Sequence, residues 1–287
     1  MLTAEADRSL LKVSINILYP CLIIDAVLGN PALEKIGNVL LPPAVGFATA
    51  VLGYLVCTFG ARFLPLDEKK ARTFAFTAGM YNYGYIPIPL VQKFFGRETM
   101  GVLFTHNLGV EIAFWTAGLF ILTRGSSEKG GWRNLLSAPV IAIVAAVALN
   151  FFGAHGWLPP FLLTTIHMLG QSYVPLILLL TGATFADQLP KNPIHIADAT
   201  TLAACVLRML LLPALFLLIA KFLPCSVELK RIIVIQAAMP AAMLPVILAK
   251  HYGGDADTAL RIVFFTVLVS LFTIPVWMRV GFYFVGI

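Results

Sequence analysis

The sequence predicts an all-α protein that crosses a membrane several times, and three observations lead to that prediction. The 287 residues are 59% hydrophobic and only 12% charged. Apolar runs of membrane-spanning length follow one another along the whole chain. Two of these runs are interrupted by prolines, at Gly79–Leu90 and at Gln236–Pro245.

The low share of charged residues excludes a water-soluble globule, because soluble domains carry roughly 25% charged residues. The net charge of +6 comes without any long basic run. Lys and Arg in such a chain are typical of cytoplasmic loops and membrane-surface anchors. The expected partner is therefore the lipid bilayer and not a nucleic acid. The four cysteines show no metal-site spacing, so we expect neither a disulfide nor a structural metal.

Nine candidate spans satisfy the rule that about 20 apolar residues cross the hydrocarbon core. They cover about 10–28, 39–60, 73–95, 100–123, 135–153, 160–186, 197–221, 230–250 and 258–282. The connections are too short to hold a soluble domain. The first span begins after Thr3–Arg8 and is interpreted as a retained helix, not as a cleaved signal peptide.

The side of the membrane that holds the N-terminus carries more Lys and Arg than the other side. Cytoplasmic loops are enriched in these residues. The bias therefore predicts a cytoplasmic N-terminus and, with an odd number of spans, a C-terminus outside.

The two interrupted spans are the most informative feature of the chain. Each proline removes a backbone donor and clashes with the preceding turn, so a continuous helix is not expected there. Broken backbone at membrane depth survives only where protein or a water-filled cavity covers it. Two such interruptions in matching places of two halves predict the binding site of a secondary transporter.

A weak internal repeat supports this interpretation. Tyr19-Pro20-Cys21-Leu22-Ile23 is similar to Tyr173-Val174-Pro175-Leu176-Ile177, and Pro87 follows the first motif at nearly the interval at which Pro240 follows the second. An offset of five spans inverts one copy relative to the other. We expect a first repeat of four helices over 1–124, with its first helix missing, and a second of five over 125–287. Together they would form one transmembrane domain.

The chain resembles the bacterial branch of the auxin efflux carrier family. The resemblance covers essentially the whole sequence, and the segments that support it are Asn82-Tyr83-Gly84-Tyr85-Ile86-Pro87-Ile88-Pro89-Leu90, Pro175-Leu176, Leu180-Thr181-Gly182-Ala183, Arg208, Ala237-Ala238-Met239-Pro240-Ala241-Ala242 and Ala249-Lys250-His251-Tyr252-Gly253-Gly254-Asp255.

The resemblance implies a fold similar to that of bile acid:sodium symporters, with ten helices in two inverted repeats and two broken helices that cross near the midplane. It also implies export of carboxylate-bearing organic anions. This sequence departs from the family by lacking the first helix. It also lacks the long cytoplasmic loop of plant members, which argues against auxin as the substrate.

Asn82 is the main candidate for contact with substrate. Its amide offers donors and an acceptor beside freed backbone groups, and half-helix N-termini attract carboxylates. The matching asparagine of family members helps to bind substrate. The alternative is that Asn82 only satisfies the freed backbone. The predicted substrate-binding set is Asn82, Tyr83, Pro87, Gln236, Met239 and Pro240, in which the prolines are architectural and Gln236 has an interhelical hydrogen bond as its alternative.

Glu111, Asp25 and Arg208 are ionisable residues in apolar spans and form the predicted set for proton or ion coupling. A buried carboxylate such as Glu111 is a plausible proton carrier. Asp25 lies near a span end, where a solvated or helix-capping role is an equal alternative. For Arg208 we favour a structural counter-ion to Glu111 or Asp25 over an attractor of anions.

No catalytic or nucleotide-binding motif is present, so no enzyme and no cofactor are expected. The leading hypothesis is efflux of a small organic anion by alternating access in the inner membrane, coupled to a proton, sodium or substrate gradient. A sodium-coupled importer is the alternative, with ligands drawn from Asn82, Thr105, Asn107, Glu111 and Gln236. A non-transporting membrane sensor is a third hypothesis. A homodimer is compatible with the sequence, which does not fix the oligomeric state.

Overall fold

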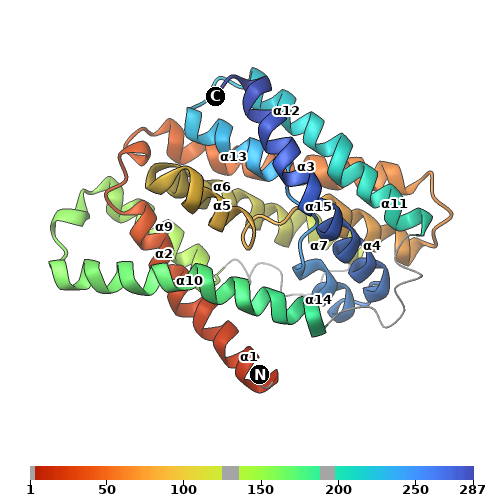
Figure 1. Ribbon diagram of the computed structural model, residues 1–287, viewed down its shortest axis with the longest axis horizontal. Coiled ribbons are helices and arrows are strands. Elements are labelled where there is room, and N and C mark those ends of the chain that lie inside the picture. The colour runs from red at the N-terminus through yellow and green to blue at the C-terminus, as the bar shows by residue number, and fades with distance from the viewer. Residues whose placement is uncertain (1–3, 125–135, 188–197) are drawn as a thin grey trace.

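The structure is a computed structural model that describes residues 4–124, 136–187 and 198–287 (Figure 1). The described part is helical, and its only strand-like feature is one isolated bridge. In chain order its helices are α1 (Ala4–Val13), α2 (Tyr19–Val27), α3 (Gly37–Ala61), α4 (Glu68–Gly79), α5 (Pro87–Phe94), α6 (Gly96–Ala113), α7 (Leu119–Thr123), α9 (Ala138–Phe151), α10 (Pro160–Asp187), α11 (Ala199–Val206), α12 (Leu212–Phe222), α13 (Val227–Ala237), α14 (Leu244–His251) and α15 (Ala256–Val285). Each predicted span coincides with a helix or with consecutive helices of this series.

Three of the spans contain a π-helical turn. The turns are η1 (Ser14–Leu18) between α1 and α2, η3 (Phe114–Gly118) between α6 and α7, and η6 (Leu207–Leu211) between α11 and α12. Pro20 follows η1 and Pro213 follows η6 within two residues. A proline lacks the N–H of a regular turn, and a wider turn before it accommodates the lost bond. The helix therefore continues past each proline without breaking.

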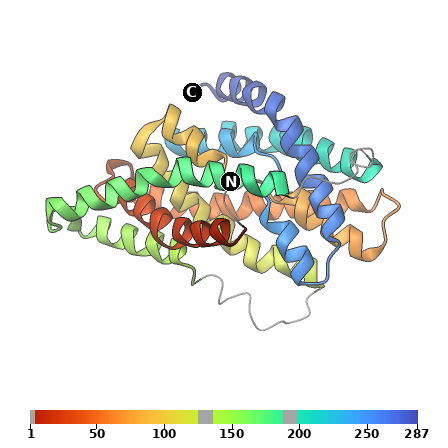
Figure 2. The same ribbon diagram turned by 60° about the horizontal axis from the view of Figure 1, so that its bottom comes forward.

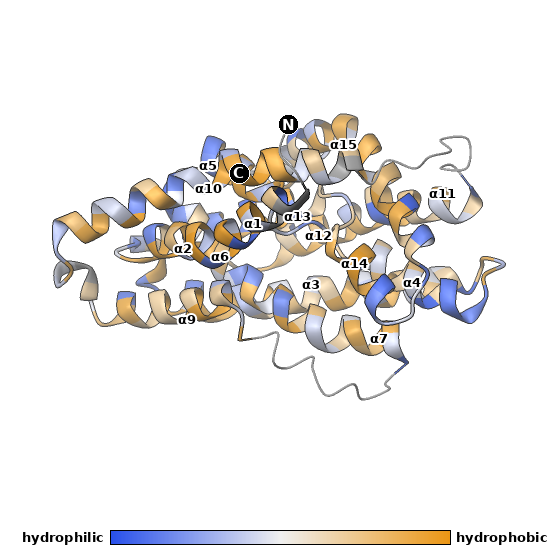
Figure 3. Cartoon of the chain, turned by 90° about the horizontal axis from the view of Figure 1, so that it is seen from below, coloured by the Kyte–Doolittle hydropathy of each residue, from blue (hydrophilic) through white to orange (hydrophobic). Residues whose placement is uncertain are grey.

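Five stretches of the described chain are long and apolar enough to cross a membrane: Ser9–Val27, Gly37–Ala61, Pro160–Thr184, Ala199–Phe222 and Ala256–Val285. Many large apolar side chains on the helices are exposed, among them Leu179 at 72% and Phe272 at 79%. Figure 3 shows apolar residues along α9, α10 and α15, with hydrophilic residues at helix ends such as the start of α4. This outer surface suits contact with lipid, and the protein is a multi-pass membrane protein.

The helices pack in two groups. In one, α2 packs against both α9 and α10 (Figures 1 and 2). In the other, α3 packs against α4 and α6, and α15 packs against α4, α11 and α14. Contacts between α2 and α6 join the groups. Each group draws helices from both predicted repeats, and the division of the chain into repeats over 1–124 and 125–287 stays a prediction.

Glycines let α3 and α6 pack with their backbones in contact. A Cβ at Gly109 would meet the carbonyl of Pro43, and a Cβ at Gly46 would meet the carbonyl of His106. Small residues at helix interfaces allow this close approach within membranes. The group that contains α3 and α6 is therefore tightly packed.

Both interrupted spans are broken as predicted. Residues 80–86 are non-helical between α4 and α5, and residues 238–243 are largely non-helical between α13 and α14. Pro87 and Pro245 lie in the first turn of the helix that follows each break, where a missing N–H costs nothing.

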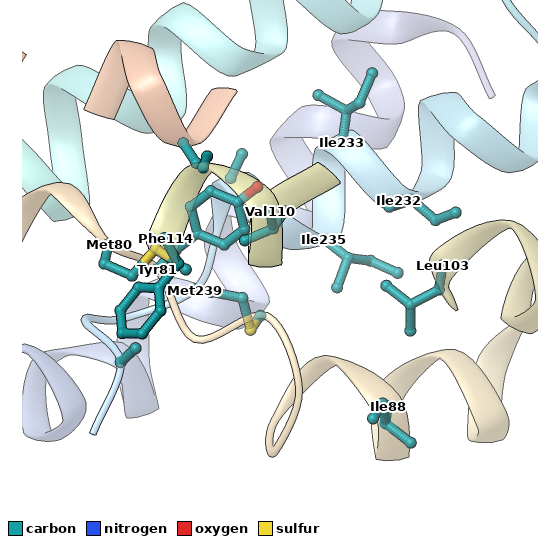
Figure 4. Close-up of a cluster of buried hydrophobic side chains, with 14 of the residues drawn as sticks. Met80, Tyr81, Ile88, Leu103, Val110, Phe114, Ile232, Ile233, Ile235 and Met239 are labelled. Atoms are coloured by element: carbon teal, nitrogen blue, oxygen red, sulfur yellow. The ribbon is translucent and has the colours of Figure 1, made fainter. Parts of the chain in front are cut away.

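The two breaks cross and pair through their main chains. The N–H of Asn82 donates to the carbonyl of Pro240 over 2.8 Å, and the N–H of Ala242 donates to the carbonyl of Met80 over 3.0 Å. Tyr81 and Ala241 form an antiparallel bridge between these bonds. Figure 4 shows Tyr81 and Met239 close to this crossing, within the buried core. The crossing satisfies backbone groups that the breaks leave free.

Candidate functional site

A cavity of about 220 Å³ lies beside the crossing, between the two helix groups. One wall comes from η1, α2, α10 and the start of α9, and the other from the first break, α6, η3, the second break and the start of α14. Its lining residues are Ile15, Tyr19, Asn82, Tyr83, Gly84, Tyr85, Glu111, Trp115, Ser137, Pro139, Tyr173, Ala242, Met243 and Leu244. A smaller cavity of about 70 Å³ shares Asn82, Tyr85, Met243 and Leu244 with it. The two cavities therefore adjoin at these four residues.

Asn82 is 7% exposed, and its side chain bonds to backbone N–H groups of the break that precedes α5. Its Oδ1 accepts the N–H groups of Gly84 at 3.3 Å and Ile86 at 3.4 Å. The amide thus satisfies freed backbone, as one of the two interpretations of the sequence expects. Within the described part of the chain its Nδ2 makes no hydrogen bond, so these donors are available beside the cavity.

Glu111 is held by two donors in the cavity wall. The hydroxyl of Tyr83 donates to Oε1 over 2.7 Å, and Nε1 of Trp115 donates to Oε2 over 3.0 Å. Tyr83 comes from the first break, and Trp115 lies four residues after Glu111 on the same helical face. Trp115 is not among the predicted site residues. Its spacing from Glu111 is the signal that could have placed it here.

A network of amides holds the backbone of Tyr83. Nδ2 of Asn107 donates to the Tyr83 carbonyl over 2.9 Å, and Nε2 of Gln236 donates to Oδ1 of Asn107 over 3.3 Å. Nε2 of Gln236 also reaches the Tyr83 carbonyl at 3.5 Å. Gln236 is 1% exposed and does not line the cavity. It makes the interhelical hydrogen bond that was its alternative role.

The other predicted substrate-binding residues lie behind the cavity wall. Pro87 is buried in the first turn of α5, Met239 is fully buried in the hydrophobic core, and the Pro240 carbonyl is bonded to Asn82. The second break contributes Ala242, Met243 and Leu244 to the lining instead. Of the predicted set, the structure brings Asn82 and Tyr83 to the cavity.

Four aromatic residues of the lining were not predicted as site residues. Tyr19 and Tyr173 stack with ring centroids 4.8 Å apart, and they come from the two similar sequence motifs of α2 and α10. Tyr85 and Trp115 complete this aromatic lining. The repeated Tyr near each Pro was the signal in the sequence, but the stacking depends on how α2 and α10 pack.

The expectation that Arg208 is a counter-ion to Glu111 or Asp25 is wrong. Arg208 is fully buried in η6, and its Nη1 donates to the carbonyl of Gly79 over 3.3 Å. Its guanidinium lies 5.5 Å from the ring centroids of Tyr81 and Phe216. The cation therefore sits at the C-terminal end of α4, where helix carbonyls are unpaired and the helix dipole favours positive charge.

Asp25 lies apart from Glu111 and Arg208, near the end of α2. Its Oδ2 is 3.0 Å from Nδ1 of His167 on α10. Its carbonyl accepts from Nε of Arg97 over 2.8 Å, and Arg97 also donates to the carbonyl of Leu28. These polar groups line two further cavities that lack the crossing residues. The three predicted coupling residues are thus in three different places.

The comparisons with known proteins agree with this architecture. The model of the Membrane transport protein family matches residues 1–131 and 122–278, which together span nearly the whole chain. The chain belongs to this family, the auxin efflux carrier family.

Two relatives extend the likeness over the full length. An uncharacterized transporter of Methanothermobacter thermautotrophicus is 28% identical over 277 residues, which are 95% of this chain and 89% of that protein. An uncharacterized transporter of Methanocaldococcus jannaschii is 23% identical over 284 residues, which are 96% of this chain and 90% of that protein. As a family member, the protein is a membrane transport protein built from membrane-spanning helices.

Proposed function

We propose that the protein is a secondary transporter that exports a small organic carboxylate by alternating access. The observation that supports this most directly is the cavity at the crossing of the two broken helices, with the free amide donors of Asn82 beside it. Amide donors at the start of a half-helix attract carboxylates.

The position of the cavity supports alternating access. Tyr19 and Tyr173 belong to the group of α2, α9 and α10, whereas Asn82 and Glu111 belong to the other group. A relative movement of the two groups would open the cavity to one side and close it to the other. We place the protein in the plasma membrane, the inner membrane of a bacterial cell, with the N-terminus in the cytoplasm. Its energy would come from a proton, sodium or substrate gradient.

A sodium-coupled importer is less favoured by the contacts at the crossing. Oδ1 of Asn82 and Oδ1 of Asn107 already accept N–H groups, and the hydroxyl of Thr105 donates to the carbonyl of Val102. A sodium site needs several free oxygen ligands, and among the candidate residues Oε1 of Gln236, which is buried without a hydrogen-bond partner in the described structure, and the lone pairs of the Thr105 hydroxyl are fewer than such a site needs. Both oxygens of Glu111 also accept donors.

Flux measurements in proteoliposomes test the proposal. We expect labelled small carboxylates to cross the membrane with the purified protein, and Asn82→Ala to reduce that flux at least tenfold. Flux that appears only with a sodium gradient would favour the importer. Binding without flux would favour a sensor, and neither flux nor binding of any carboxylate would refute the proposal.

A further inference from the structure

The charge of the main cavity is a problem for a purely anionic ligand. Glu111 is the only ionisable acid or base among its lining residues apart from the tyrosines, and none of these described lining residues is Lys, Arg or His. A carboxylate ligand would therefore sit beside a second carboxyl group, and like charges at close range repel each other strongly in a medium of low dielectric constant.

Both oxygens of the Glu111 carboxyl group accept hydrogen bonds in the cavity wall. Each of its oxygens accepts one hydrogen bond, from Tyr83 and from Trp115, and an ionised carboxylate is a pure acceptor. No Lys, Arg or His pairs with it in the described part of the chain. Arg208, the buried cation, bonds to Gly79 instead. An ionised carboxylate at membrane depth needs a partner of opposite charge.

Five aromatic residues share the cavity with Glu111. Tyr19, Tyr83, Tyr85, Trp115 and Tyr173 all line the same space as Glu111. The faces of tyrosine and tryptophan rings attract ammonium groups, and such attraction strengthens when the cation is desolvated. A carboxylate with several aromatic rings around it is the chemistry that recognises an organic ammonium.

Asn82, which lines the same cavity, has the opposite preference. Oδ1 of Asn82 accepts the N–H groups of Gly84 and Ile86, just before the first turn of α5. Its Nδ2 makes no hydrogen bond in the described part of the chain and is a free donor. Asn82 and Tyr83 are consecutive, and the hydroxyl of Tyr83 is on Glu111. Asn82 and Glu111 line the same cavity of about 220 Å³, so one small molecule can reach both side chains.

We propose that the cavity binds an amino-acid-like zwitterion, with its ammonium group on Glu111 among the aromatic rings and its carboxylate on Asn82. This inference rests on the proposed carboxylate transport and names the substrate class. The cavity has a volume of about 220 Å³. That size suits a small amino acid, and Ile15, Pro139 and Leu244 offer an apolar surface to its side chain.

Matched compounds separate the two charged groups of the ligand. One series is alanine, propanoate and ethylamine, and the other is L-leucine, 4-methylpentanoate and 3-methylbutylamine. Within each series the second compound lacks the ammonium group and the third lacks the carboxylate. Flux of each labelled compound is measured in proteoliposomes that contain the wild-type protein, so the comparison does not depend on the folding of any variant.

We expect the amino acid of at least one series to be transported at least tenfold faster than both of its partners. Glu111→Gln keeps the size of the side chain and an acceptor for Tyr83 or Trp115, and we expect it to remove that advantage. Glu98→Gln is the matched control, because Glu98 is exposed on the same helix and does not line the cavity. It should transport like the wild-type protein.

Each contrary result has a distinct meaning. Equal transport of the deaminated acids and the amino acids, unchanged in Glu111→Gln, would overturn the ammonium pole and leave carboxylate transport standing. Preference for the amines would overturn the carboxylate pole. No transport of any of the six compounds would overturn the zwitterion, and a wider panel of carboxylates would then decide whether the proposed function also fails.

Discussion

The backbone N–H of Asn82 donates to the backbone carbonyl of Pro240, 158 positions later in the chain, over 2.8 Å. With the bond from Ala242 to Met80, it joins the two interrupted helices into one crossing. The side-chain oxygen of Asn82 accepts N–H groups of Gly84 and Ile86 within the first break, and its Nδ2 lies beside two cavities. One residue therefore connects the architecture of the crossing to the site where a ligand would bind.

Substitutions at Asn82 can separate the role of Oδ1, which accepts backbone N–H groups of the break, from the donor role of Nδ2. Asn82→Ala removes both, and we expect a loss of about 1 kcal/mol in the free energy of unfolding, typical of a lost hydrogen bond, together with loss of flux. Asn82→Asp keeps an oxygen for these N–H groups but replaces the donors by negative charge. It should lose carboxylate flux, and its buried charge without a cationic partner should also lower the stability. Denaturation in detergent and proteoliposome flux measure the two effects, and retained flux in Asn82→Asp would contradict the donor role.

The N–H of Ala242 should be essential to the crossing. Ala242→Pro removes the donor to the Met80 carbonyl, and an unpaired buried acceptor costs about 1–3 kcal/mol. We expect a correspondingly lower thermal midpoint in detergent. Ala242→Gly keeps the N–H and is the control. Equal midpoints for the two variants would show that the crossing does not depend on this bond.

Arg208 contributes a buried charge with one hydrogen bond at 3.3 Å. Its Nε and Nη2 have no partner in the described structure. Replacing a buried ion by an apolar side chain of similar volume is often neutral or stabilising. Arg208→Met should therefore keep or raise the thermal midpoint, whereas Arg208→Ala should destabilise the protein by about 2 kcal/mol or more through the cavity it leaves. If the two variants lose stability equally, the guanidinium itself is required at the end of α4.

Asp255 should make stability depend on pH at the start of α15. Burial alone would raise the pKa of this carboxyl, but the hydrogen bonds from Thr258 and the charges of Lys70 and Lys69 outweigh it and lower the pKa. A pKa that is lower in the folded state adds stability above the pKa of the unfolded chain. That stability is lost as pH falls through the folded value, below about pH 4.

The control for this pH dependence is Asp255→Asn, which keeps a capping oxygen for the Thr258 N–H without a titratable group. Unfolding in detergent at several pH values should show an acid-dependent loss in the wild-type protein that the variant lacks at this site. A parallel loss in both proteins would assign the pH dependence to other residues. Asp255→Ala should cost about 1 kcal/mol at neutral pH, as a lost cap does.

The sequence was sufficient to predict the spans and both breaks, because apolar length and proline act locally. It identified Asn82, Tyr83 and Glu111 from polar side chains in apolar runs. It did not predict that Met239 faces the core while Met243 faces the cavity, since that depends on how Tyr81 and Ala241 pair across the crossing. The sequence also did not predict the partner of Arg208, because Gly79 accepts through its backbone carbonyl and has no side chain that would mark it.

The crossing between Met80–Asn82 and Pro240–Ala242 is made by main-chain atoms. Any residue except proline supplies the N–H that is needed at positions 82 and 242. The side chains around the crossing can therefore be substituted during evolution while the two interrupted helices stay hydrogen-bonded to each other. Relatives only 23–28% identical can in this way keep one scaffold and acquire different cargo.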